Sequence, residues 1–176
     1  MVYPTLMAAA VGEHFGMTLP EIAAGVRNFA PTKMRMNVLD RGEGITILDD
    51  AYNANPQSMR AAIEVLDGYT GGYKVAVLGD MFELGPLAAV LHAGVGEYLG
   101  RSRIDCLVAV GEEAKNIYDA AISSQVPECY YFETKEKAVL TLHDLLRPGT
   151  TILVKASRGM EFEFIVDYLK GITKEA

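Results

Sequence analysis

The chain has 176 residues, 50% of them hydrophobic and 22% charged, which allows one sizeable core and a small appendage. A formal net charge of −7, with the 16 basic residues spread along the chain, argues against nucleic-acid binding, because neutralising phosphates requires clustered Lys and Arg. No apolar run approaches the roughly 20 residues that span a bilayer, no signal peptide opens the chain, and neither cysteine has metal-type spacing. We therefore expect a cytoplasmic protein with reduced thiols and no membrane partner.

The first 30 residues predict two helices. Residues Leu6 to Phe15 are Ala-rich and end near Gly16, and Thr18-Leu19-Pro20-Glu21 supplies an N-cap, a first-turn proline and an early acid for a helix that continues to Phe29. A hairpin follows, because strand-like residues 36–39 and 45–49 flank a turn containing Gly42 and Gly44.

From residue 45 onward, predicted strands alternate with predicted helices. The strands are 45–49, 74–78, 106–110, 130–132 and 151–155, and the helices are 56–66, 88–100, 113–123, 135–146 and 161–169. Such alternation predicts an α/β fold with a mainly parallel sheet and helices on both of its faces. The hairpin adds one antiparallel strand.

The segment from Asp49 to Arg60 has the composition of a binding loop. It places two carboxylates, a phenol, two asparagines and a helix-starting proline between the apolar strand 45–48 and an apolar helix. Polar side chains that follow the carboxyl end of a strand are typical of ligand sites in open α/β sheets. We therefore expect the main site at this edge of the sheet.

Four segments, in order, resemble the Mur ligases. They are the loop 49–60, the pattern Gly79-Asp80-Met81-Phe82-Glu83-Leu84-Gly85, His92 with Val95-Gly96-Glu97, and Val154-Lys155-Ala156-Ser157-Arg158-Gly159-Met160. The second pattern resembles the members that join D-alanyl-D-alanine to UDP-N-acetylmuramoyl-tripeptide in peptidoglycan synthesis. The resemblance implies an ATP-dependent ligase of the cytoplasm that forms an acyl-phosphate on the tripeptide, which the dipeptide amine then attacks.

The resemblance also implies a domain organisation. Residues 1–30 would be the helical tail of the family's central ATP-binding domain, 31–35 a linker, and 36–176 a Rossmann-like carboxy-terminal ligase domain. The Gly-Lys-Thr/Ser loop with which the family binds ATP phosphates is not in this sequence, and the family's Mg²⁺ ligands lie in the same central domain. We therefore expect a carboxy-terminal fragment that uses ATP and Mg²⁺ only within a longer enzyme and is inactive alone.

The resemblance assigns ATP contacts to the loop after the second strand. Asp50 would bind the ribose hydroxyls, since a carboxylate accepts two such donors, with Asp49 the less favoured partner; the alternative is that Asp50 caps the following helix. Tyr52, Asn53 and Asn55 would line the adenine, although asparagines often only close turns through their own backbone.

Arg35 is assigned from the same resemblance, and Asp80 is assigned from its place after a strand, on the same edge of the sheet as Asp50. Arg35 corresponds to an arginine that meets the terminal phosphate during transfer; the alternative is an ordinary surface arginine, and Lys33-Met34 before it departs from the family's usual glycine. Asp80 follows a strand, beside Gly79, whose missing side chain allows close backbone approach. Asp80 would orient the substrate amine or cap the next segment.

The loop after the last strand is the candidate binding site for a substrate carboxylate. Lys155, Ser157 and Arg158 supply an ammonium, a hydroxyl and a guanidinium, all suited to a carboxylate such as that of D-alanyl-D-alanine. Alternatively, this basic loop merely closes the strand. Ala156 stands where the family usually has glycine. The helical His92 is read as a core or surface residue, and no metal site is assigned.

The partners implied are the tripeptide nucleotide, D-alanyl-D-alanine and the enzyme's own central and amino-terminal domains, in a monomer. Two alternatives stay open. A sibling ligase that adds an amino acid would share the ATP residues without the Gly79 to Gly85 pattern. A non-catalytic nucleotide-binding α/β module is disfavoured, because apolar residues of the first helix, such as Leu6 and Phe15, would need a neighbouring domain.

Overall fold

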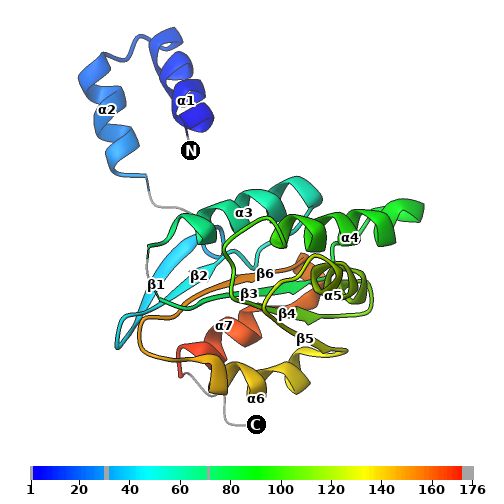
Figure 1. Cartoon of the computed structure of the whole chain (residues 1–176). Helices are drawn as coiled ribbons and strands as arrows, with labels where there is room; N and C mark the ends of the chain where they lie inside the picture. The colour runs from blue at the N-terminus through cyan, green and yellow to red at the C-terminus, as the bar shows by residue number, and fades with distance from the viewer. Residues whose placement is uncertain (1, 30–31, 71, 172–176) are drawn as a thin grey trace. The chain divides into compact units, whose positions relative to one another are not determined.

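The computed structural model describes residues 2–29, 32–70 and 72–171 (Figure 1). The chain divides into two compact units, Met1–Thr32 and Lys33–Ala176. Within the described residues, no helix is both long and apolar enough to cross a membrane.

The first unit is a pair of helices, α1 (Val2–His14) and α2 (Leu19–Arg27). Both were predicted from the sequence. Thr18 begins α2 as expected: its backbone N–H and its hydroxyl both donate to the Glu21 carboxylate, at 2.8 and 2.7 Å. Gly12 of α1 leaves room for Ile22, because a Cβ at Gly12 would lie 2.8 Å from the Ile22 side chain.

The second unit is built on a six-stranded sheet in the order β1-β2-β6-β3-β4-β5. Only β1 runs antiparallel to its neighbour, so the predicted fold class is confirmed. The strands are β1 (Asn37–Gly42), β2 (Ile45–Asp49), β3 (Lys74–Gly79), β4 (Cys106–Val110), β5 (Glu128–Phe132) and β6 (Thr151–Lys155).

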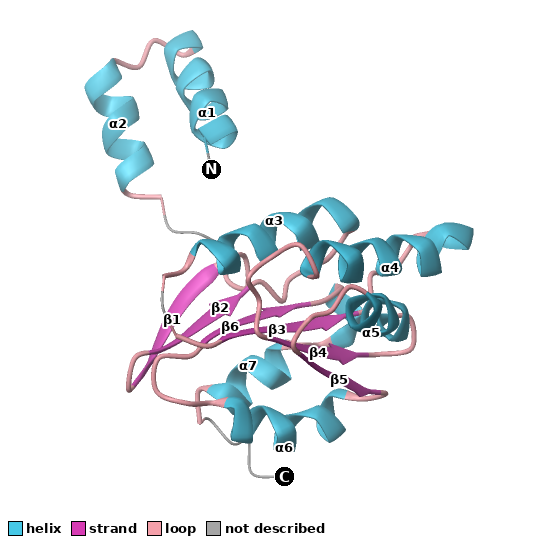
Figure 2. Cartoon of the chain, in the orientation of Figure 1, coloured by secondary structure: helices cyan, strands magenta, loops and turns pink. Residues whose placement is uncertain are grey.

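Helices cover both faces of the sheet (Figure 2). On one face lie α3 (Pro56–Gly68), α4 (Ala88–Leu99) and α5 (Ala114–Ser123), and on the other lie α6 (Lys135–Leu145) and α7 (Glu163–Leu169). The helix starting at residue 161 was placed two residues too early. A short 3₁₀ turn, Arg158–Met160, intervenes, and Glu161 has a left-handed backbone with φ of 53°, which interrupts helical geometry.

The position of β6 determines where a ligand can bind. The chain builds β3, β4 and β5 outward and then returns, inserting β6 between β2 and β3. After β2 and β3 the chain continues into α3 and α4, which lie on one face of the sheet (Figure 2). After β6 it continues into α7, which lies on the other face. Loops that diverge from neighbouring parallel strands open a crevice at their carboxyl ends, where open α/β sheets bind ligands.

The two cysteines are free thiols in this fold, Cys106 buried and Cys129 half-buried. Burial raises the pKa of Cys106 to about 12 and also raises the pKa of Cys129. Because thiol reagents attack the thiolate, we expect native protein at pH 8 to label far more slowly with iodoacetamide at Cys106 than unfolded protein does. Mass spectrometry of timed samples measures this, and equal native and unfolded rates would contradict the buried position.

Candidate functional site

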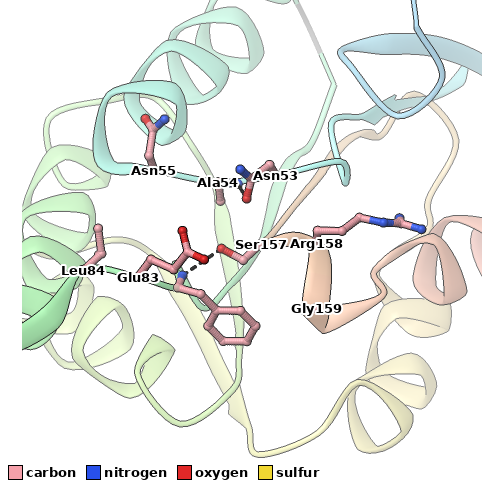
Figure 3. A pocket seen from close by; sticks show the side chains of 9 residues that line it. Asn53, Ala54, Asn55, Glu83, Leu84, Ser157, Arg158 and Gly159 are labelled. Atoms are coloured by element: carbon pink, nitrogen blue, oxygen red, sulfur yellow. Dashed lines mark hydrogen bonds between the residues drawn. The ribbon is translucent and has the colours of Figure 1, made fainter.

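A hollow of about 470 Å³ lies at the carboxyl edge of the sheet, between the loops that follow β2, β3 and β6 (Figure 3). These are the loops that diverge at the inserted strand. The lining residues are Asn53, Ala54, Asn55, Phe82, Glu83, Leu84, Ser157, Arg158 and Gly159. Four of them were expected from the sequence, namely Asn53, Asn55, Ser157 and Arg158. Segments from three parts of the chain thus meet at one site.

Asp50 and Lys155 form an ion pair under the loop that follows β2. The Lys155 ammonium lies 2.5 Å from Asp50 Oδ2 and donates to the Asn53 carbonyl at 2.9 Å. The Lys155 side chain is only 2% exposed and that of Asp50 is 16% exposed. The Met36 N–H donates to the other carboxylate oxygen at 3.0 Å. Lys155 therefore holds the loop through both a carboxylate and a backbone carbonyl. Its ammonium, which was predicted to face a substrate carboxylate, is buried in this pair and is not part of the lining of the hollow.

Asn55, rather than Asp50, caps α3. Its side chain accepts from the Ser58 N–H at 2.8 Å, and the Ser58 hydroxyl accepts from the Asn55 N–H at 3.0 Å, which is a reciprocal capping box. The alternative in which Asp50 caps this helix is therefore wrong. Asn53 Oδ1 accepts from the neighbouring Ala54 N–H at 2.9 Å. Both asparagines thus shape the loop while lining the hollow; their role in adenine binding stays a prediction.

Ser157 joins the β6 loop to the β3 loop. Its backbone N–H donates to the Asp80 carbonyl at 2.9 Å, and its hydroxyl oxygen accepts from the Phe82 N–H at 2.8 Å. The residue before Phe82 is held by His92, whose Nε2 accepts from the Met81 N–H at 2.9 Å while Nδ1 lies 2.7 Å from the Ala88 carbonyl. This pairing requires the proton on Nδ1.

The Asp80 side chain is buried at the start of α5 rather than at the hollow. Its carboxylate accepts from the Ala114 N–H at 2.7 Å, so it caps a helix that follows a different strand. Gly111 makes this approach possible, because a Cβ there would lie 2.4 Å from an Asp80 oxygen. Burial raises the pKa of the Asp80 carboxyl, and backbone N–H donors partly offset the rise. Burial likewise raises the pKa of Asp49, whose carboxylate accepts from the Ala51 N–H.

The two predicted arginines have different surroundings. The Arg35 guanidinium stacks over the ring of Tyr52, with its carbon 4.3 Å from the ring centroid; both side chains are exposed. Arg158 pairs with Glu163 at 2.9 Å through Nη1, which also lies 3.6 Å from the Met34 sulfur. Arg35 and Tyr52 thus form an exposed pair that is not part of the lining of the hollow, whereas Arg158 is part of it.

Five lining residues were not predicted as site residues: Ala54, Phe82, Glu83, Leu84 and Gly159. Phe82, Glu83 and Leu84 belong to the Gly79 to Gly85 pattern that resembles the Mur ligases, but Asp80 alone in this pattern was predicted to be a site residue. Gly79 itself faces the core. A Cβ there would lie 2.5 Å from the Phe162 ring and 2.7 Å from Ala156, so the close approach it permits is to those side chains.

Within residues 2–29, 32–70 and 72–171, no group of three or more His, Cys, Asp or Glu side chains is placed to hold a metal ion. The residues around the hollow instead offer amides, a hydroxyl, one carboxylate and one guanidinium. This donor set suits a polar organic ligand. It does not suit a bare Mg²⁺ ion, which prefers several oxygen ligands in octahedral geometry.

Comparison with known proteins agrees with this arrangement. Residues 34–158 match the family described as Mur ligase, glutamate ligase domain. The UDP-N-acetylmuramoyl-tripeptide--D-alanyl-D-alanine ligase of Bacillus subtilis (strain 168) is 35% identical over 167 residues, which cover 94% of this chain and 36% of that protein. The chain therefore spans about a third of the length of this curated relative.

Solved structures give the same result. A crystal structure of MurF from Acinetobacter baumannii superposes with a TM-score of 0.81 at 32% identity, covering 89% of this chain and 35% of that one. MurF ligase from Thermotoga maritima, in complex with ADP, gives a TM-score of 0.74 at 27% identity, covering 93% of this chain and 36% of that one. By its sequence match across residues 34–158, the chain belongs to the Mur ligase family.

Proposed function

We propose that this chain is the carboxy-terminal part of an ATP-dependent ligase that joins D-alanyl-D-alanine to UDP-N-acetylmuramoyl-tripeptide. The observation that carries the proposal is that the loops following β2, β3 and β6 meet around one polar hollow, at the edge of the sheet where these loops diverge to opposite faces. Support comes from the B. subtilis relative of that name, which matches over 94% of this chain. In this proposal the reaction takes place in the cytoplasm and the enzyme is a monomer.

In this proposal the chain works within a longer polypeptide. Residues 1–30 belong to the central ATP-binding domain, residues 31–35 are a linker, and residues 36–176 are the ligase domain that closes over the nucleotide. Exposed apolar side chains on the first unit, including Tyr3, Met7 and Phe15, are consistent with such a neighbour. Closure of this kind excludes water and completes the site from two domains.

ATP is the proposed cofactor, together with Mg²⁺ held by the central domain. Asp50 would accept the ribose hydroxyls, and Tyr52, Asn53 and Asn55 would border the adenine. Each carboxylate oxygen of Asp50 already accepts one donor, from Met36 or Lys155. A carboxylate has about four lone-pair positions, so the pairing leaves acceptor capacity for ribose. The ADP complex of the T. maritima ligase supports nucleotide binding by this family.

The remaining roles follow the path of the reaction. Arg35, which stacks on the ring of Tyr52, would meet the terminal phosphate as charge develops on it. Ser157 and Arg158 would hold the dipeptide, together with the loop backbone that Lys155 fixes at Asn53. Asp80 would contribute indirectly, because its backbone carbonyl accepts from the Ser157 N–H and so positions Ser157. The dipeptide amine then attacks the acyl-phosphate, and phosphate departs.

Phosphate release by the complete ligase containing this chain tests the proposal. ATP, Mg²⁺ and UDP-N-acetylmuramoyl-tripeptide are supplied with and without D-alanyl-D-alanine, and the 176-residue chain alone serves as the control. We expect release only from the complete ligase and only with the dipeptide. Release that requires a single amino acid instead would identify a sibling ligase. No release from the complete ligase would leave a nucleotide-binding module.

Replacing Asp50 with asparagine should weaken ATP binding selectively. Asparagine keeps an acceptor for the Met36 N–H but loses the negative charge that would accept from the ribose, and a hydrogen bond to a charged group contributes enough to change the Michaelis constant for ATP about 10-fold. The substitution also removes the carboxylate partner of the buried Lys155 ammonium, so a lower melting temperature is expected as well, and the kinetics are measured well below that temperature. Steady-state kinetics of the complete ligase measures this constant beside that for the dipeptide. An ATP constant that does not change, or a larger change in the dipeptide constant, would remove the ribose assignment.

A further inference from the structure

We propose that Glu83 is the residue that binds the ammonium group of the incoming dipeptide. The inference rests on the function proposed above and names a recognition residue for its second substrate. Glu83 lies in the loop after β3 and lines the hollow, beside Ser157 (Figure 3).

The backbone holds Glu83 in an unfavourable conformation. Its φ is 63°, a left-handed value that favours glycine over residues with a side chain. The two preceding residues are fixed by side chains from other elements, since the Met81 N–H donates to His92 and the Phe82 N–H donates to Ser157. Backbone strain of this kind persists where surrounding contacts determine it, and it concentrates at functional sites.

The Glu83 carboxylate is the available anion of the hollow. Among the residues that the structure describes, no hydrogen bond or ion pair is made by this side chain. The cation of the same hollow, Arg158, already has a carboxylate partner in Glu163, at 2.9 Å. A carboxylate held toward a polar hollow without a cation partner is suited to a cationic group of a ligand.

The rest of the lining fits a small zwitterionic dipeptide. Arg158 lies on the other side of Ser157 from Glu83, and its guanidinium points away from Glu83 (Figure 3). Its two contacts both use Nη1, so its other N–H groups remain as donors for a ligand carboxylate that extends past Ser157. Ala54, Phe82 and Leu84 supply apolar surface for two methyl groups. Ammonium, methyls and carboxylate, in that order, are the groups of D-alanyl-D-alanine.

With the dipeptide bound in this way, Glu83 would also contact the ammonium group from which a proton must be removed. The ammonium gives one proton to the Glu83 carboxylate, and the neutral amine nitrogen then bonds to the acyl carbon. The bond from that carbon to the phosphate oxygen breaks, phosphate leaves with the electron pair, and a second nitrogen proton ends on it as hydrogen phosphate. The acyl-phosphate comes from ATP in the proposed reaction, so no other reactant is required.

The test compares Glu83→Gln with the unmodified complete ligase by steady-state kinetics. Glutamine keeps the size and the backbone but loses the charge, so we expect the Michaelis constant for D-alanyl-D-alanine to rise about 10-fold or more. The constants for ATP and for the tripeptide nucleotide should stay within about twofold, because uniform damage to the fold would change all three.

Two further variants complete the design. Glu43→Gln is the matched control, because Glu43 is an exposed glutamate with φ of 54° at the β1–β2 turn, at the opposite edge of the parallel strands; its kinetics should be unchanged. Glu83→Gly removes the carboxylate and relieves the left-handed strain, so it should lose dipeptide affinity without a lower melting temperature.

The outcomes separate the two proposals. An unmodified ligase that shows no dipeptide-dependent phosphate release overturns the proposed function itself. An active ligase in which Glu83→Gln and Glu83→Gly both keep the normal dipeptide constant overturns only the role of Glu83. A selective rise in that constant in both variants, with Glu43→Gln unaffected, supports it.

Discussion

Replacing Lys155 with methionine is expected to lower the free energy of unfolding by about 3 to 5 kcal/mol, because breaking a buried ion pair leaves its other charge uncompensated. The Lys155 ammonium is shared by the Asp50 carboxylate and the Asn53 carbonyl, and its side chain is 2% exposed. Methionine fills a similar volume, so the decrease in the free energy of unfolding comes mainly from the Asp50 carboxylate and the Asn53 carbonyl, which lose their shared cation. Urea unfolding of the 176-residue chain, followed by circular dichroism, measures the difference.

Lys135 provides the matched control. Its ammonium also contacts one carboxylate and one backbone carbonyl, those of Glu161 and Met160, each at 3.0 Å. However, the Glu161 side chain is 71% exposed, so water replaces the lost contact, and Lys135→Met should change stability by less than about 1 kcal/mol. Equal effects of the two substitutions would show that the Lys155 pair is solvated and does not hold the loop.

Replacing Gly96 with alanine should destabilise the fold by about 2 kcal/mol or more, through overpacking between two helices. Gly96 lies in α4 at its contact with α5, where an added Cβ would lie 2.2 Å from the Ile117 carbonyl oxygen and 2.9 Å from the Ala121 nitrogen. Both are backbone atoms, so α5 as a whole would have to move. Thermal and urea unfolding of the variant measure the loss.

Gly94, two residues earlier in the same helix, is the control for that substitution. Its added Cβ would lie 3.5 Å from the end of the Arg60 side chain, which is an ordinary contact with a flexible group. Gly94→Ala should therefore stabilise the protein by roughly 0.5 to 1 kcal/mol, because alanine is the better helix former. If both substitutions destabilised the protein, the cause would be a general intolerance of α4 to alanine and not the close contact of Gly96 with α5.

For some residues of the candidate site, the hydrogen-bond partners can be predicted from neighbouring residues in the sequence. For others they cannot. Asn55 stands directly before Pro56 and three residues before Ser58, so its capping role can be inferred from neighbouring residues. Asp80 stands at the end of β3 and was expected to face a ligand or to cap the next segment. Instead it caps α5, which begins 34 residues later, because β3 and β4 are neighbours in the sheet.

The family resemblance identified the segments that form the site, and the comparisons confirmed the family. It did not identify Glu83 or the function of His92. His92 was read as an ordinary helical histidine, and it is fully buried, but its ring determines the position of the Met81 N–H. A histidine among apolar residues has no sequence signal that names its partner, since hydrogen bonds between elements depend on how those elements pack.

The sequence by itself determined the alternation of strands and helices, the fold class and the loops that carry polar side chains. These features depend on periodicity and turn chemistry within a few residues. Only the tertiary structure decided that Lys155 reaches Asp50, 105 residues away, and that Glu83 lines the same hollow as Asn53 and Ser157. Both results follow from the insertion of β6 between β2 and β3, because strand order is set by the packing of the whole sheet and not by any local pattern.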